Sequence, residues 1–200
     1  MALRITEPPA EEAVPTPHRF LAAVRSDPVN AALLDRLPAL GLPQGYLTAG
    51  CLFQAWWNRR SGRPPGEAVK DYDVFYFDDH DLSWDAEDAV IRRVQDAVAD
   101  LPAEVEVKNQ ARVHLWYPAR FGHAYPQLRA ATEGIDRYLV ACTCIGVALD
   151  DGALHAPDGL DDLHDGILRP NPLMPAPGLF AAKAASYQAR WPWLTIMASP

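Results

Sequence analysis

The sequence lacks several features that mark other classes of protein. No apolar run reaches the roughly 18 residues of a membrane-spanning helix, and no segment repeats along the chain. Residues 1–17 are rich in proline, glutamate and alanine but have neither a basic start nor an apolar stretch, so we do not expect a signal peptide. We expect this segment to be a flexible N-terminal arm ahead of a single domain over 18–200, whose C-terminal helical part begins near residue 170.

Cysteine and positive charge are also scarce. The three cysteines, Cys51, Cys142 and Cys144, have an odd count and apolar neighbours, which argues against a disulfide framework and indicates a reducing, cytoplasmic location. The formal net charge is −8, with 26 acidic against 18 basic residues. Because nucleic-acid binding generally requires a basic surface, nucleic acid is not an expected partner. We expect no membrane contact either.

Apolar residues, by contrast, are plentiful: 49% of the 200 residues are hydrophobic, enough for one full core. Periodicity and capping signals predict helices over 18–40 (one or two), 52–60, 84–101 with Ser83 as its N-cap, 132–142 and 180–190, and a short helix or turn-rich stretch over 159–167. Alternation predicts strands over 46–49, 71–77, 104–107 and 111–116, and a hairpin over 145–155 turns at Asp-Asp-Gly. This order of helices and strands predicts an α/β (α+β) fold with a mixed sheet flanked by helices.

The most informative segment is Lys-Asp-Tyr-Asp-Val-Phe-Tyr-Phe over 70–77. Asp71 and Asp73 are two residues apart at the head of an apolar strand. Because side chains alternate along a strand, both carboxylates point to one face, with Cβ atoms roughly 6.5–7 Å apart. Hard divalent cations take oxygen ligands, so the pair predicts a metal site. The plainer alternative is a solvated acidic pair on the surface.

Two neighbouring segments add to the acidic pair. The predicted strand 46–49 ends in Gly50-Cys51 and runs into a helix, whose first backbone N–H groups favour a phosphate. The strand 104–107 carries Glu106 as a third carboxylate, and Glu104 has the same parity and remains the alternative. Three such carboxylates could hold two magnesium ions for an in-line phosphoryl displacement, or the third could accept a proton from an attacking hydroxyl.

If strands 104–107 and 111–116 are continuous, Lys108, Arg112 and His114 share the face of Glu106. The charge of Lys108 would then offset the carboxylates, and Arg112 could bind phosphate. For His114 a structural hydrogen-bonded role is the better interpretation. The loop arginines Arg59, Arg60 and Arg63 serve either a triphosphate or only solvent.

These residues resemble the nucleotidyltransferase superfamily of the DNA polymerase β type. The superfamily pattern has Gly-Ser or Gly-Gly at the start of a helix, Asp-x-Asp on the next strand and a third acid on a later strand. The corresponding segments here are Gly50-Cys51, Asp71-Tyr72-Asp73 and Val105-Glu106-Val107. More narrowly, the chain is similar to a family of small bacterial nucleotidyltransferase-like proteins. That likeness covers most of the chain and is strongest in EVKNQARVHLWY at 106–117 and RPNP at 169–172.

The resemblance implies a nucleotidyltransferase-like sheet and metal-dependent transfer of a nucleotidyl group from a nucleoside triphosphate to a small-molecule acceptor, with Mg²⁺ or Mn²⁺. The residues it implies are Asp71, Asp73 and Glu106 for catalysis and metal binding, and Gly50, Cys51, Lys108, Arg112 and Lys183 for nucleotide or phosphate. Cys51 replaces the usual serine or glycine and so lacks a hydroxyl. The alternative is therefore a non-catalytic member that binds a nucleotide or a protein.

Other interpretations of Asp-x-Asp fit less well. In phosphatases of the haloacid dehalogenase type the acids follow an apolar strand, whereas here the apolar run follows the acids. A glycosyltransferase would need a longer nucleotide-binding region ahead of the motif, and an EF-hand loop lacks Gly and Glu at the required offsets. The acids and histidines over 155–164 are predicted to form a polar loop rather than a second metal site.

Overall fold

The computed structural model describes residues 13–122 and 124–197. Most of the predicted N-terminal arm, residues 1–12, lies outside the described residues. The eight α-helices of the described part are α1 Pro17–Val24, α2 Pro28–Arg36, α3 Gly50–Arg60, α4 Trp84–Ala97, α5 Val113–Phe121, α6 Ala131–Ile135, α7 Asp161–Asp165 and α8 Pro177–Arg190. Three 3₁₀ turns accompany them: η1 Leu37–Leu40, η2 Gln110–Arg112 and η3 Ala141–Thr143. Within the described residues, no helix is long and apolar enough to cross a membrane.

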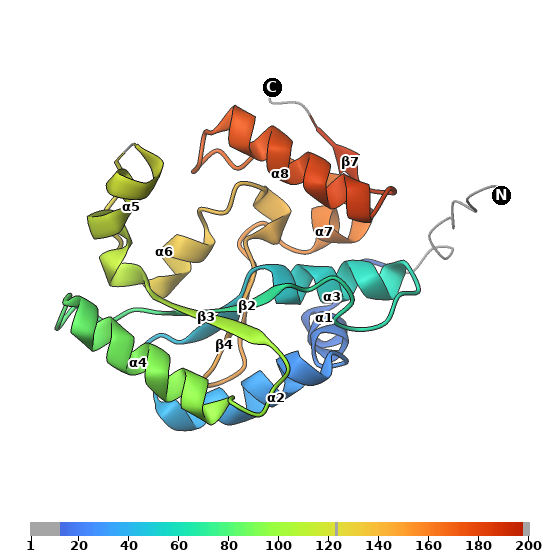
Figure 1. The fold of residues 1–200 in the computed structure, drawn as a ribbon. Coiled ribbons are helices and arrows are strands. Elements are labelled where there is room, and N and C mark those ends of the chain that lie inside the picture. Colours follow the sequence, from blue (N-terminus) through green and yellow to red (C-terminus); the bar gives the residue numbers. More distant parts are fainter. Residues whose placement is uncertain (1–12, 123, 198–200) are drawn as a thin grey trace.

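A mixed sheet forms the centre of the molecule, as predicted. Its strands are β1 Tyr46–Thr48, β2 Asp71–Tyr76, β3 Glu104–Asn109, β4 Gly146–Ala148 and β5 Leu154–His155, in the order β3-β2-β1-β4-β5. The predicted hairpin is confirmed as the antiparallel pair β4–β5. A separate parallel pair, β6 Ile167–Leu168 with β7 Thr195–Ile196, joins the chain after α7 to the chain after α8. In Figure 1, α2 and α4 lie on one side of the sheet, and α5, α6 and α8 lie on the other.

Strands β2 and β3 are parallel, whereas β1 is antiparallel to both of its neighbours. Parallel strands need a crossover connection, and α4 supplies it. The predicted N-cap of that helix is confirmed, because the Ser83 side chain accepts a hydrogen bond from the Ala86 N–H at 3.2 Å. The register aligns Asp71 with Glu104 and Asp73 with Glu106.

The tryptophans of the core fix the last helix to α3. Trp57 and Trp191 are fully buried with ring centroids 5.2 Å apart. The Trp191 indole N–H donates to the Asn58 side-chain oxygen at 3.0 Å, and the Trp57 indole N–H donates to the Leu163 carbonyl at 3.1 Å. A buried indole N–H needs such a partner. This packing holds α8 over the cleft described below.

The strand predicted over 111–116 is wrong. β3 ends at Asn109, whose side-chain oxygen accepts from the Ala111 N–H at 3.0 Å and whose amide donates to the Asp78 carbonyl at 2.7 Å. These bonds turn the chain into η2 and then α5, since an Asn side chain offers the backbone an alternative to the sheet ladder. Arg112 and His114 therefore do not continue the face that carries Glu106.

The helix predicted over 132–142 is also largely wrong, because only α6 forms there. The Asn171 side chain donates to the carbonyls of Asp136 and Tyr138, both at 2.7 Å. A continued helix would use those carbonyls for its own hydrogen bonds. Asn171 belongs to a segment 33 or more residues away, so no local signal could reveal this competition.

Candidate active site

The acidic pair lies on two adjacent strands beside the start of α3. Because β2 and β3 are parallel and in register, Asp71, Asp73, Glu104 and Glu106 occupy one face of the two strands. Thr48, the last residue of β1, pairs with Asp73, and α3 begins two residues later at Gly50. The topology thus brings the three predicted motifs together: the helix start, the Asp-x-Asp strand and the third acid.

Asp73 lies in an unfavourable environment for a negative charge. Burial raises the pKa of its carboxyl to about 7; the Lys108 ammonium opposes this rise, and the carboxylates of Asp71 and Glu106 add to it. Lys183, from α8, also opposes the rise, and it lines the same cleft as Asp73. Like charges held together in this way are stabilised by a bound cation.

Glu106 is paired with a lysine rather than with the aspartates. The Lys108 Nζ donates to the Glu106 carboxylate, and both side chains are partly exposed. Asp71, Asp73 and Lys108 line one cavity, whereas Glu106 lines a neighbouring cavity that also includes Lys108. The lysine therefore stands between Glu106 and the acidic pair.

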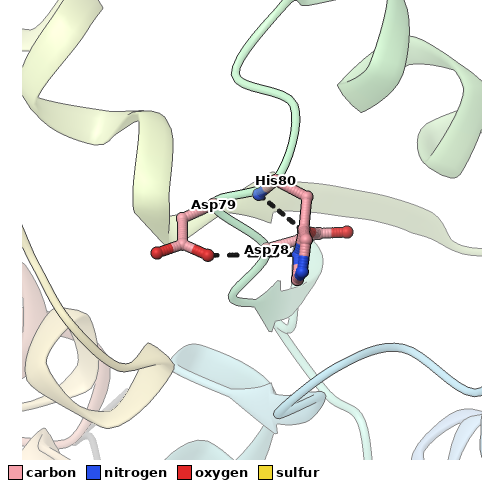
Figure 2. A group of neighbouring side chains, drawn as sticks. All are labelled: Asp78, Asp79 and His80. Carbon is pink, nitrogen blue, oxygen red and sulfur yellow. Dashed lines mark hydrogen bonds and ion pairs between the residues drawn. The ribbon is translucent and has the colours of Figure 1, made fainter.

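One other acidic group lies outside this site. In the described part of the chain, one group of three side chains has its potential metal-ligand atoms all within 4.8 Å of one another (Figure 2). It consists of Asp78, Asp79 and His80. The His80 side chain is 92% exposed, and its N–H and ring nitrogen both contact the Asp78 carboxylate, at 3.0 and 2.9 Å. Those hydrogen bonds hold the pKa of Asp78 below its usual value. The segment follows β2 in the chain, and Asp79 and His80 are exposed.

The start of α3 has strained backbone. Ala49 adopts φ 64° and ψ −140°, a combination that residues with a side chain rarely adopt. At Gly50, an added Cβ would lie 2.4 Å from the Gln54 amide nitrogen. The chain turns here from β1 into α3, and the first N–H groups of a helix are the ones available to an anion. Both Ala49 and Gly50 line the same cleft as Asp73.

Two residues predicted to bind phosphate do not direct their side chains to the cleft. Cys51 is fully buried, its thiol donates to the Thr48 carbonyl at 3.2 Å, and burial raises its pKa. Arg112 is buried in an ion pair with Glu87, and its Nε donates to the Leu82 carbonyl at 2.9 Å. Cys51 can therefore offer only its backbone N–H. Arg112 instead fastens α4 to the turn after β3.

A cleft of about 730 Å³ connects these groups, with walls from β2, α3, α5, α6 and α8. Besides Asp71 and Asp73, its charged lining consists of cations: Lys70, Lys108, Arg120, Arg137, Lys183 and Arg190. In a chain with a net charge of −8, this gathering of positive charge is the electrostatic signature of an anionic ligand.

Arg190 is a site residue that sequence reasoning missed. Its guanidinium donates to the Gln54 side chain at 3.1 Å and lies 4.6 Å from the Trp191 ring centroid. Lys183 and Arg190 are seven residues apart on α8, which is two helical turns, so they share one face. That spacing was the signal in the sequence that could have paired Arg190 with Lys183.

A second set that sequence reasoning missed is aromatic. The rings of Trp116, Tyr117, Phe121 and Tyr125 line the cleft opposite α3 and contact one another. We call this set the aromatic wall. Because tryptophan side chains are usually part of a core, the sequence did not mark Trp116 as a cleft residue.

A second, larger cavity of about 840 Å³ lies between α4 and the free edge of β3. Its lining includes Trp84, which is 59% exposed, together with Glu104 and Glu106. It contains neither the acidic pair nor the start of α3, so we place the candidate active site in the smaller cleft.

An acidic strand pair beside a helix start, on a mixed sheet of this order, defines a fold of the nucleotidyltransferase type. A solved NMR structure described as revealing a CCA-adding enzyme head domain has this fold, with a TM-score of 0.71 and 23% identity over 92% of this chain and 97% of that chain. No curated protein matches the chain. The chain belongs to the nucleotidyltransferase family, whose model matches residues 35–196, and it is thus a transferase of the EC 2.7.7 type. The predicted family and fold are confirmed.

Proposed function

We propose that this protein is a metal-dependent nucleotidyltransferase that moves a nucleotidyl group from a nucleoside triphosphate to a small-molecule acceptor. The observation that carries the proposal is the register of β2 and β3, which aligns Asp73 with Glu106 beside the N-terminus of α3. Family membership supports nucleotidyl transfer, and the cationic cleft supports an anionic donor.

The carboxylates Asp71, Asp73 and Glu106 would hold the metal. Their donor atoms are all oxygens, which suits Mg²⁺ or Mn²⁺, and the partly buried Asp73 charge has carboxylates as neighbours. A bound divalent ion supplies charge neutralisation for the phosphates and for the leaving oxygen. Lys108, which now pairs with Glu106, would turn toward the phosphates once Glu106 has another partner.

The remaining cleft residues fit a triphosphate. The backbone N–H groups of Gly50 and Cys51 at the start of α3 would bind phosphate oxygens. Lys183 and Arg190 on α8 would approach the same phosphates from the opposite wall. Arg112 has no part in this binding because Glu87 occupies it.

Thermal unfolding tests donor binding. We expect Mg²⁺ with at least one of the four common nucleoside triphosphates to raise the melting temperature by several degrees, since a ligand at 100 times its Kd adds about 2.7 kcal/mol. Asp73→Asn should abolish the shift. Asp79→Asn is the matched control: it removes a carboxylate from the exposed group at 78–80 and should leave the shift intact. Absence of a shift with all four triphosphates would contradict the proposal.

Transfer itself separates the enzyme from a non-catalytic nucleotide-binding member of the fold. The protein is incubated with Mg²⁺, an α-labelled triphosphate and a small-molecule cell extract, and labelled products are resolved by chromatography. We expect a labelled product with the wild type and none with Asp73→Asn. A melting shift without any labelled product would favour the non-catalytic alternative.

A nucleic-acid end is the second candidate acceptor, because the fold matches that of a protein described as a CCA-adding enzyme head domain. The net charge of −8 argues against it, since neutralising a phosphate backbone requires a basic surface. Total RNA in the same labelling assay tests it. Label in RNA rather than in small molecules would select this candidate.

A further inference from the structure

The cleft has two chemically different ends, with the acidic pair between them. One end contains the start of α3 together with Lys183 and Arg190, next to the first residues of β2. The other end is the aromatic wall, and it lies where β3 has ended and run on into α5 (Figure 1). Phe75, two residues beyond Asp73 on the same face of β2, lines the cleft between the carboxylates and that wall.

The aromatic wall presents ring surfaces to the cavity. Tyr117 is at its centre, with ring centroids 5.9 Å from Trp116, 4.5 Å from Phe121 and 4.4 Å from Tyr125. Phe121 is 46% exposed, and the other three rings are half-buried. Partly exposed rings that line a cavity offer stacking surfaces to a planar ligand.

Two cations accompany these rings. The Arg120 guanidinium lies 5.4 Å from the Phe121 ring centroid, and Arg120 lines the cleft. Arg137 lies near Tyr125: burial raises the pKa of that phenol to about 12, and the Arg137 charge opposes the rise. The wall therefore combines stacking surfaces with positive charge, which suits a planar ring bearing an anionic group.

The direction of nucleotidyl transfer gives this end of the cleft its role. In an in-line displacement, the attacking and leaving oxygens lie on opposite sides of the α-phosphorus. In the proposed function the phosphates lie beside α3 and Lys183, so the pyrophosphate would leave on that side and the attacking hydroxyl would enter from the side of the aromatic wall.

We infer that the aromatic wall, with Arg120 and Arg137, is the acceptor subsite, and that the acceptor has a planar aromatic ring, an anionic group and a hydroxyl. This inference rests on the proposed function and names its acceptor class. The acceptor oxygen bonds to the α-phosphorus as the bond from that phosphorus to the bridging oxygen breaks. Pyrophosphate leaves, and the hydroxyl proton passes to a carboxylate of the site and then to water.

Calorimetric titration tests the subsite. The donor site is first filled with Mg²⁺ and the α,β-methylene analogue of whichever triphosphate shifts the melting temperature most. The probes are the four ribonucleoside 5′-monophosphates and 4-hydroxybenzoate, which separate a nucleotide source of the ring from an aromatic acid. Ribose 5-phosphate, which has the charge but no aromatic ring, is the negative probe. We expect at least one ring-bearing probe to bind at least tenfold more tightly than ribose 5-phosphate.

Three variants show where the probe binds. Tyr117→Leu keeps an apolar side chain but removes the central ring, and should weaken probe binding by about 5- to 150-fold, the range for loss of one stacking ring. Arg120→Gln should weaken it by a smaller factor. Leu115→Ala, on the same helix, is the control: Leu115 is 52% exposed and lines neither cavity, so probe binding should not change.

The outcomes distinguish this inference from the proposed function. If triphosphates raise the melting temperature but no ring-bearing probe binds, or Tyr117→Leu binds it as well as the wild type, the acceptor subsite is refuted and the proposed function stands. If Tyr117→Leu abolishes the triphosphate shift instead, the wall holds the donor base and the inference is equally wrong. If no triphosphate shifts the melting temperature, the proposed function fails first, and the same titration without donor still shows whether the wall binds a ring.

Discussion

At the scale of the residue, the site is built at the expense of local stability. Asp73 is partly buried near two other carboxylates, and Ala49 adopts a backbone conformation that favours glycine. Each feature opposes folding, and each is at a position where the proposed function uses it. Asp27 shows the contrast: it is buried, but its carboxylate accepts from the Tyr72 hydroxyl at 2.9 Å and from the Val29 N–H at 2.9 Å. The structural carboxylate Asp27 accepts two hydrogen bonds, whereas Asp73 has two carboxylates among its charged neighbours besides Lys108 and Lys183.

This difference gives a stability prediction for the metal-free protein. The pKa of Asp73 is raised in the folded state from 3.8 to about 7, so the folded state holds this proton more tightly than the unfolded state. The contribution of Asp73 to stability is therefore fully present below about pH 4 and is lost as pH rises toward 7. In EDTA at pH 8 we expect Asp73→Asn to melt several degrees above the wild type, and the gap to narrow at pH 5.

The measurement is thermal unfolding by circular dichroism at both pH values. Asp79→Asn, which removes an exposed carboxylate, should show no comparable gain. A variant Asp73→Asn that melts below the wild type at pH 8 would show that the carboxylate is stabilising, and would contradict the charge environment described above.

At the scale of the element, the sequence predicted most of what positions the site. The helix start at Gly50, the strand of Asp71 and Asp73, the α4 cap at Ser83 and the β4–β5 hairpin are all local patterns, and all formed. The failures have one cause. Asn109 and Asn171 bind backbone groups that a strand or helix would have used, and the Asn171 partners are distant in sequence. Periodicity does not record such competition.

The error after Asn109 also misplaced Arg112 and His114. The predicted continuation of the strand placed Arg112 on the same face as Glu106. The resemblance to nucleotidyltransferases then implied that Arg112 binds phosphate. In the structure it is paired with Glu87 instead. Arg137 and the aromatic wall were missed because their relevance depends on which elements surround the cleft. The spacing of Lys183 and Arg190 shows that they share a helix face, but not that this face borders the cleft.

The Glu87–Arg112 pair gives a prediction about α4. Glu87 also accepts from the Asn109 N–H at 2.8 Å, so the pair joins the helix to the end of β3. Arg112→Met would leave the Glu87 charge buried without its partner, and should cost about 3–5 kcal/mol of unfolding free energy. Adding Glu87→Gln should recover part of that loss, since glutamine can still accept from the backbone.

Denaturant unfolding of the wild type, the single variant and the double variant measures both effects. Because Arg112 is not expected to touch the nucleotide, the triphosphate-induced shift in melting temperature should survive in the double variant. Loss of that shift with stability restored would return Arg112 to the list of nucleotide ligands.

At the scale of the whole molecule, charge is strongly segregated. The cleft gathers six cations from β3, α5, α8 and neighbouring loops around two aspartates, so the rest of the chain is more acidic than the net charge of −8. A positive cleft in an acidic body draws a compact anion such as a triphosphate and repels an extended polyanion. This arrangement favours a small acceptor over a nucleic-acid strand.

The salt dependence of triphosphate binding follows from this segregation. The Debye length falls from about 10 Å at 0.1 M salt to about 3 Å at 1 M, so the attraction of the cleft cations weakens as salt rises. We expect the Kd for a triphosphate with Mg²⁺ to rise steeply between 0.05 and 0.5 M NaCl, and the slope of log Kd against log salt to be smaller in Lys183→Gln. Arg92→Gln removes the same charge from the outer face of α4, where Arg92 pairs with Asp88, and should leave the slope unchanged. If the two variants alter the slope equally, net charge rather than the cleft governs binding, and the segregation has no part in recognising the donor.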